Sequence, residues 1–156
     1  MGGYMKKSLM WLYFILISCA LNTFADTGAH SGHSLIGQPG NPAQVSRTIE
    51  IKMIENRFLP HEITIRQGET IRFLVKNEGK KHHEFTIDTI KNLKEHAKMM
   101  RAHPDMLHNE PNQLKVAPGE QKELIWHFTE TGIVDFACPY PGHFKGMQGK
   151  IYVEKK

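Results

Sequence analysis

Apolar and polar residues alternate with a period of two through most of the chain after residue 46. Turn residues such as Gly and Asn separate the alternating runs, which lie at 49–53, 63–65, 71–75, 82–87, 124–128, 134–138 and 149–153. This period is typical of strands that bury one face. Seven or eight short strands at this spacing predict an all-β fold, an antiparallel β-sandwich of Greek-key type.

One segment has the periodicity of a helix instead. Its apolar residues recur three or four positions apart, at Ile90, Leu93, Ala97 and Met100. Good helix formers lie between them, and Pro104 follows. We therefore predict a helix at 89–102, within an insert at about 88–111 between two strands.

The N-terminus has the pattern of a secretory signal peptide. Lys6 and Lys7 precede an apolar run at 9–17, and no acidic residue occurs before Asp26. The apolar run is too short for a comfortable membrane span, so we predict a signal peptide at residues 1–25 and a periplasmic protein.

An alternative concerns Cys19, which ends a sequence that resembles the bacterial lipoprotein box and would then carry a lipid anchor. After the signal peptide, residues 26–46 are rich in Gly, Pro, Ser and Asn, and we interpret them as a flexible leader. The folded domain is then expected at 47–156.

Composition limits the classes of partner. The chain has 156 residues and a formal charge of +4, which falls to +2 when Lys6 and Lys7 leave with the signal peptide. No long run of Lys and Arg occurs, so neither nucleic acid nor an anionic membrane is indicated. About 130 residues suit one domain, which we expect to be monomeric. Cleavage also leaves Cys138 as the only cysteine, so it is either an inert buried thiol or a metal ligand.

Three soft or nitrogen-containing side chains lie within ten residues, on a loop with two prolines and two glycines: Cys138, His143 and Met147. A thiolate, an imidazole and a thioether together favour copper. Blue-copper sites combine two His, one Cys and a weak axial Met, so one more histidine is required.

Strand parity identifies that histidine. His83 shares its face with Phe85 and Ile87, the core side, whereas His82 points with Glu84. A buried imidazole without a partner would be costly. We therefore predict His83 as the fourth ligand.

These residues carry a family resemblance. The chain resembles the cupredoxins, the family of plastocyanin, azurin and pseudoazurin, in three motifs: His83-Glu84-Phe85, Cys138-x4-His143-x3-Met147 and the terminal strand 149–153. The resemblance covers roughly residues 47–156. It implies one type 1 copper ion and electron transfer rather than enzymatic turnover. It also implies a redox partner protein that docks near His143.

Two features depart from that pattern. Glu84 stands where azurin and plastocyanin usually have Asn, which puts the reduction potential in question. The insert is similar to that of periplasmic cupredoxins associated with copper tolerance, and His96, Met99 and His103 would share one helical face. These three residues are a candidate secondary copper site, although the methionines could instead pack on the sandwich. The alternative function is therefore copper sequestration or copper tolerance.

Overall fold

The computed structural model describes residues 1–2, 37–103 and 109–156. The chain divides into two units, 1–30 and 31–156. Almost all of the first unit lies outside the described residues, and so do the predicted signal peptide and Cys19. No helix in the described part of the chain is long and apolar enough to cross a membrane.

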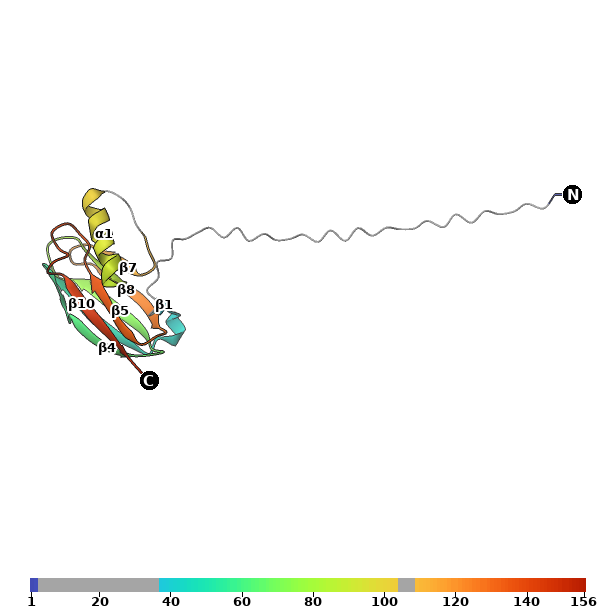
Figure 1. The fold of residues 1–156 in the computed structure, drawn as a ribbon, viewed down its shortest axis with the longest axis horizontal. Helices are drawn as coiled ribbons and strands as arrows, with labels where there is room; N and C mark the ends of the chain where they lie inside the picture. Colours follow the sequence, from blue (N-terminus) through green and yellow to red (C-terminus); the bar gives the residue numbers. More distant parts are fainter. Residues whose placement is uncertain (3–36, 104–108) are drawn as a thin grey trace. The chain divides into compact units, whose positions relative to one another are not determined.

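Two five-stranded sheets form the domain (Figure 1). The first has the order β1 (Gly37–Pro39), β8 (Gln121–Phe128), β5 (Thr70–Asn77), β2 (Arg47–Ile54) and β3 (Arg57–Leu59). The second has the order β4 (Glu62–Arg66), β10 (Gln148–Glu154), β9 (Gly132–Ala137), β6 (His83–Asp88) and β7 (Gln113–Val116). The predicted all-β sandwich with one inserted helix is confirmed.

The pairing is not antiparallel throughout. β2 pairs with β5, and β4 with β10, in parallel registers, while the other strand pairs are antiparallel. Strand alternation reports which face of a strand is buried and carries no information about the direction of its neighbour. The expectation of an antiparallel sandwich is corrected on this point.

The inner faces of both sheets supply an aromatic core. Its largest side chains are at most 2% exposed, and they include Phe58, Phe73, Phe85, Phe128, Phe136 and Trp126. Phe85 and Phe136, from neighbouring strands of one sheet, have ring centroids 5.2 Å apart, and Phe58 from the other sheet contacts both. The alternation in the sequence predicts all of these core residues except Phe58, which lies in the three-residue strand β3, outside the alternating runs.

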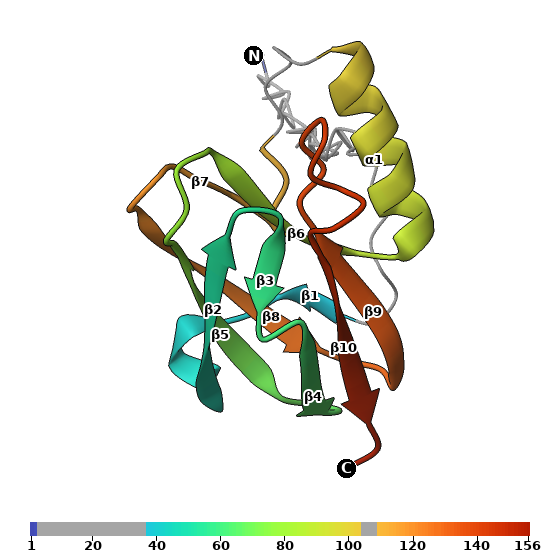
Figure 2. The ribbon, with the colours of Figure 1, turned by 90° about the vertical axis from the view of Figure 1, so that its left-hand side faces the viewer.

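Helix α1 (Ile90–Ala102) follows β6 directly, close to the predicted bounds. Thr89 caps it by accepting a hydrogen bond from the Asn92 N–H through its hydroxyl. Leu93, Ala97 and Met100 form its buried face. Figure 2 shows α1 beside β9 and the loop that precedes β10. Because α1 contacts β6 and β9, the outer face of β6 is covered as well as its inner face.

The domain begins earlier than predicted. The sequence predicts a flexible leader up to residue 46, but β1 pairs with Phe128, His127 and Trp126 of β8, and a short 3-10 helix, η1 (Pro42–Gln44), follows. The boundary at residue 47 is therefore wrong by about ten residues. A three-residue strand is too short to show an alternating pattern, and the Gly and Pro residues at 37–42 are typical of a loop.

Candidate metal centre

The structure brings three of the predicted ligands together at one end of the sandwich. His83 is the first residue of β6, Cys138 follows the last residue of β9, and His143 lies in the loop between β9 and β10. One ligand atom from each lies within 4.8 Å of the others. Cys138 Sγ is 3.6 Å from His143 Nδ1, and the two imidazole rings have centroids 4.9 Å apart.

Burial of these groups is nearly complete. His83 and Cys138 are 0% exposed, and His143 is 8% exposed. Neither ring nitrogen of His83 has a hydrogen-bond partner among the described residues. An orphaned buried imidazole costs free energy unless something binds it. The donor set therefore fits a soft or borderline metal ion that accepts nitrogen and sulfur ligands.

The ligand loop, residues 138–147, is held by a tight turn at His143. The N–H of His143 donates to the carbonyl of Tyr140 at 3.0 Å, with Pro141 and Gly142 between them. Gly142 has φ 82°, the conformation that the third position of a type II turn requires. The Pro-Gly pair therefore orients the imidazole through the backbone.

The loop is also closed at its base. The N–H of Cys138 donates to the carbonyl of Met147 at 3.0 Å, and the N–H of Met147 donates to the carbonyl of His143 at 3.0 Å. Met147 is 0% exposed and belongs to the same buried cluster as Cys138. Its predicted axial role remains a prediction, supported by this position at the closing bond of the loop.

Asn77 organises the approach to His83 and was interpreted from sequence only as part of a turn. Its side chain is fully buried, and its Nδ2 donates to the carbonyls of Lys81 at 2.7 Å and Val116 at 3.0 Å. Its Oδ1 accepts from the N–H of Gly79 at 2.9 Å. These bonds fix the segment before His83 to the start of another loop. The Asn-x-Gly sequence at 77–79 was the available signal.

Glu84 contributes in a way that parity did not predict. Its N–H donates to Cys138 Sγ at 3.3 Å, so a backbone group contacts the sulfur. Its carboxylate is 0% exposed because α1 covers the outer face of β6. Glu84 Oε1 accepts from the Thr86 hydroxyl at 2.6 Å and lies 3.8 Å from His96 Nε2. Burial raises the pKa of this carboxyl, and the Thr86 hydrogen bond opposes the rise.

The ionisation of the three clustered groups follows from their burial. Burial raises the pKa of the Cys138 thiol to about 12, although the N–H groups of Glu84 and Tyr140 oppose the rise. Burial and the neighbouring His143 lower the pKa of His83, and burial and Lys81 lower that of His143. At neutral pH the metal-free site therefore holds a thiol and two neutral imidazoles.

The predicted secondary residues, in α1 and at its C-terminal cap, differ in exposure. The His96 side chain is 15% exposed and faces Glu84, whereas Met99 is 37% exposed and His103 is exposed at the end of the helix. Within the described residues, only His83, Cys138 and His143 form a group of three or more His, Cys or acidic ligands. The secondary site therefore stays a prediction.

Comparisons with known proteins agree with this geometry. A family model described as a cupredoxin-like domain matches residues 12–153. The chain is 45% identical over 131 residues to the copper-resistant cuproprotein CopI of Rubrivivax gelatinosus, covering 83% of this chain and 79% of that protein. It is 35% identical over 148 residues to the protein of the same name in Pseudomonas aeruginosa, covering 76% and 82%.

A comparison with solved structures also finds a similar fold. Reduced auracyanin from the photosynthetic bacterium Roseiflexus castenholzii superposes with a TM-score of 0.59 at 26% identity, covering 70% of this chain and 98% of that one.

Proposed function

The chain belongs to the cupredoxin-like domain family, and on that premise we propose that it is a periplasmic protein that binds one type 1 copper ion and transfers electrons. His83, Cys138 and His143 would hold the ion, with Met147 as the weak axial ligand. The observation that carries this proposal concerns the two buried ring nitrogens of His83, neither of which has a hydrogen-bond partner among the described residues. One of them lies within 4.8 Å of both the Cys138 thiol and a nitrogen of His143.

The chain's own groups suit this role. Copper, when bound, supplies one-electron chemistry by alternating between Cu(I) and Cu(II). Cys138 Sγ has to release its proton on binding, because only the thiolate is a ligand, whereas the two imidazoles are already neutral. The closed loop and the Asn77 network hold the ligands in place, so little rearrangement is needed between redox states.

His143 is the ligand that supports contact with a redox partner. It is the most exposed of the three clustered residues, and exposed Gly142 and half-buried Phe144 flank it. A partner that docks there would reach the centre through one imidazole. No step requires a bound substrate, so we propose a monomeric electron carrier rather than an enzyme, exported through the signal at residues 1–25.

Visible spectroscopy tests the assignment. Cu(II) added to the mature protein is expected to give an intense thiolate-to-copper charge-transfer band, which Cys138→Ala abolishes. The matched pair His83→Ala and His82→Ala should differ, because His82 is exposed and lies outside the cluster. A colourless Cu(II) protein, or colour that survives Cys138→Ala, would overturn the proposal.

Copper tolerance is the second candidate, because the relatives from Rubrivivax gelatinosus and Pseudomonas aeruginosa carry the name copper-resistant cuproprotein. Here the same centre would act together with His96 and Met99 of α1 and with His103, the residue that follows the helix. Copper stoichiometry separates the two functions: a pure carrier should bind one tight ion, whereas a buffer should bind more. The triple variant His96→Ala/Met99→Leu/His103→Ala should then lose the additional copper and keep the visible band.

A further inference from the structure

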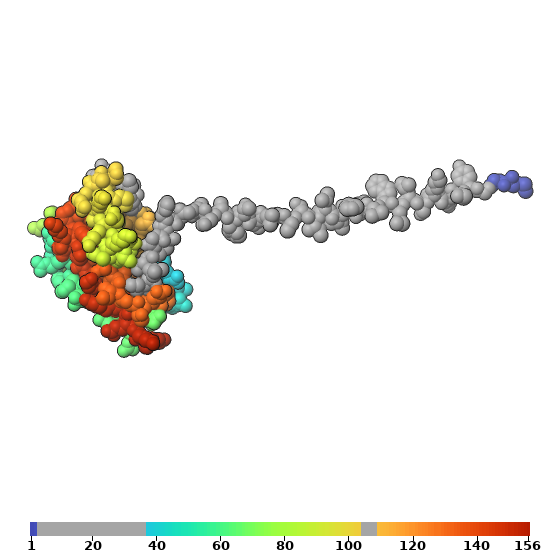
Figure 3. All heavy atoms as spheres, in the orientation of Figure 1, coloured from blue at the N-terminus to red at the C-terminus, as the bar shows by residue number. Residues whose placement is uncertain are grey.

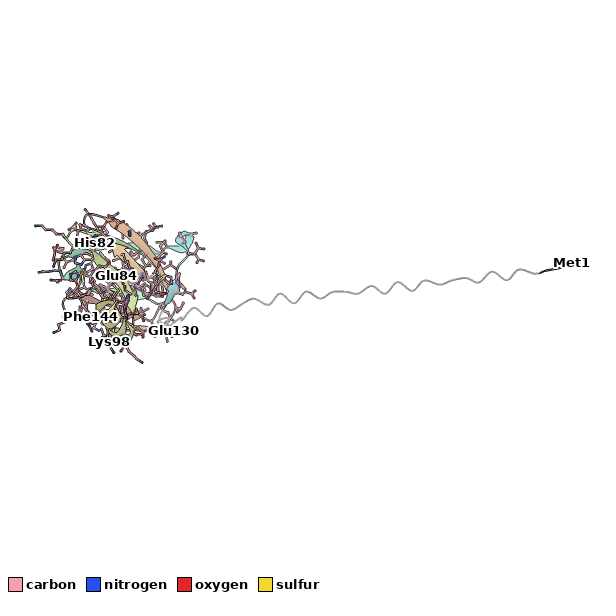
Figure 4. The ribbon with its side chains drawn as sticks, turned by 90° about the horizontal axis from the view of Figure 1, so that it is seen from above. Met1, His82, Glu84, Lys98, Glu130 and Phe144 are labelled. Carbon is pink, nitrogen blue, oxygen red and sulfur yellow. The ribbon has the colours of Figure 1, made fainter. Side chains whose placement is uncertain are left out.

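A groove runs between α1 and the ligand loop. Its volume is about 490 Å³, and its lining consists of Lys94, Ala97, Arg101, Gly142, Phe144 and Lys145. On the face shown in Figure 3, the yellow atoms of α1 lie directly beside orange-red atoms from the C-terminal part of the chain. Figure 4 shows Phe144 and Lys98 at the same edge of the domain. Two of the lining residues, Gly142 and Phe144, are the sequence neighbours of His143.

The shape of the groove follows from the helix. Lys94, Ala97 and Arg101 are spaced three and four residues apart, so they share one helical face. Ala97 is 1% exposed and small, which leaves room between the two longer side chains. Phe144 of the ligand loop adds an apolar wall, and Lys145 adds a third cation.

The charge of the groove is one-sided. Lys94, Arg101 and Lys145 line it, and no lining residue is acidic. Among residues 37–103 and 109–156, none of these three cations forms an ion pair, whereas other exposed cations such as Lys52 and Lys122 do. The mature chain has a formal charge of only about +2. The lining of the groove is therefore net positive, although the chain as a whole is only mildly basic.

These features select one class of occupant. All three cations are exposed, so a single small anion there would be screened by salt and held weakly. A surface that carries several carboxylates can engage all three cations at once and gain association rate from their field. Half-buried Phe144 would meet the apolar parts of the same surface.

We propose that this groove is the docking site of a protein partner that presents a cluster of Asp and Glu side chains. The cations would orient the partner so that its redox group approaches the His143 side of the domain. The electron-transfer consequence rests on the proposed function, whereas the binding of an acidic partner does not.

Binding is tested first on the metal-free protein, with an oligoglutamate peptide as the probe and backbone amide NMR shifts as the readout. The shifts are expected over α1 and residues 142–145, and they should vanish when ionic strength rises from about 0.01 M to about 0.5 M. Lys94→Gln/Arg101→Gln changes α1 alone and should weaken binding about tenfold. The control Lys52→Gln/Lys76→Gln removes two cations that pair with Glu78 and should bind like the wild type.

These measurements distinguish an acidic protein surface from a small anion as the occupant of the groove. Equal weakening by both double variants, or shifts scattered over the whole surface, would overturn the proposal. Inorganic phosphate that reproduces the peptide shifts at equal charge concentration would overturn it in favour of a small anion.

A second experiment separates this inference from the proposed function. Oxidation of the Cu(I)-loaded protein by anionic ferricyanide should slow several-fold in Lys94→Gln/Arg101→Gln, while oxidation by cationic tris(1,10-phenanthroline)cobalt(III) should be no slower than in the wild type. Normal electron exchange with no effect of the groove variants would refute the groove alone. Peptide binding without any electron exchange would leave the groove in place and refute the proposed function.

Discussion

Replacement of Asn77 by Ala tests how the fold holds its upstream metal ligand. The change removes three side-chain hydrogen bonds, to the Lys81 carbonyl, the Val116 carbonyl and the Gly79 N–H. Each contributes roughly 0.5–1.5 kcal/mol net, and a buried group left without a partner costs more. Since Asn77 is 0% exposed, water cannot replace the lost partners. We expect a loss of about 3 kcal/mol in the free energy of unfolding, or about 10 °C in Tm.

Urea unfolding of the metal-free protein, followed by the fluorescence of buried Trp126, measures this loss. The matched control is Asn112→Ala, which removes one hydrogen bond, from Nδ2 to the Ile87 carbonyl, at a half-buried site. It should cost about 1 kcal/mol. Asn77→Ala should also weaken copper binding, because it releases the segment before His83. An Asn77→Ala variant no less stable than Asn112→Ala, with unchanged copper affinity, would refute the reasoning.

In the folded metal-free protein, the Cys138 thiol should resist alkylation at about pH 8, because it is 0% exposed and its pKa is raised to about 12. Rapid stoichiometric labelling of Cys138 before the protein unfolds would contradict this burial. Gly149→Ala places a Cβ against the Phe136 ring and the His61 carbonyl, so it should cost about 3 kcal/mol by urea unfolding, and a neutral effect would show that β9 and β10 can separate. For Glu69, burial raises the pKa, but hydrogen bonds from the Arg66 N–H and the Arg47 side chain outweigh it and lower the pKa below 4.5. A carboxyl group whose pKa is lowered by folding stabilises the fold above pH 4.5, and this stabilisation is lost as the pH falls through the pKa of the folded state. Glu69→Gln should therefore lower the free energy of unfolding by less than about 1 kcal/mol near neutral pH and should have no effect in acid. A stability difference that does not change with pH would contradict this linkage.

Much of the site could be predicted because its information is local. The type II turn at Pro141-Gly142 and the spacing of the sulfur and nitrogen groups are encoded within ten residues. Parity within one strand then identified His83 as the inward histidine, and its complete burial agrees. Helix α1 could be predicted for the same reason, since its spaced apolar residues and its capping residue Thr89 lie in one short stretch of sequence.

What escaped prediction depends on contacts between distant segments. Parity assigned Glu84 to the outer face of β6, but it could not show that α1 buries that face as well. Asn77 became important because its side chain reaches Val116, 39 residues along the chain. The parallel pairing of β2 with β5 likewise depends on the order and direction of the strands in the sheet, which the alternation of apolar and polar residues does not reveal.

The outer strands of the two sheets have a consequence for aggregation. The edges are β1 and β3 with three residues each, β7 with four and β4 with five, whereas β8, β5 and β2 have eight each. Short edge strands offer few free backbone N–H and C=O groups to a strand of another molecule, and they cover the long inner strands. A chain truncated at residue 47 would lack β1 and leave β8 uncovered. We therefore expect such a truncated chain to self-associate more readily than one that retains β1.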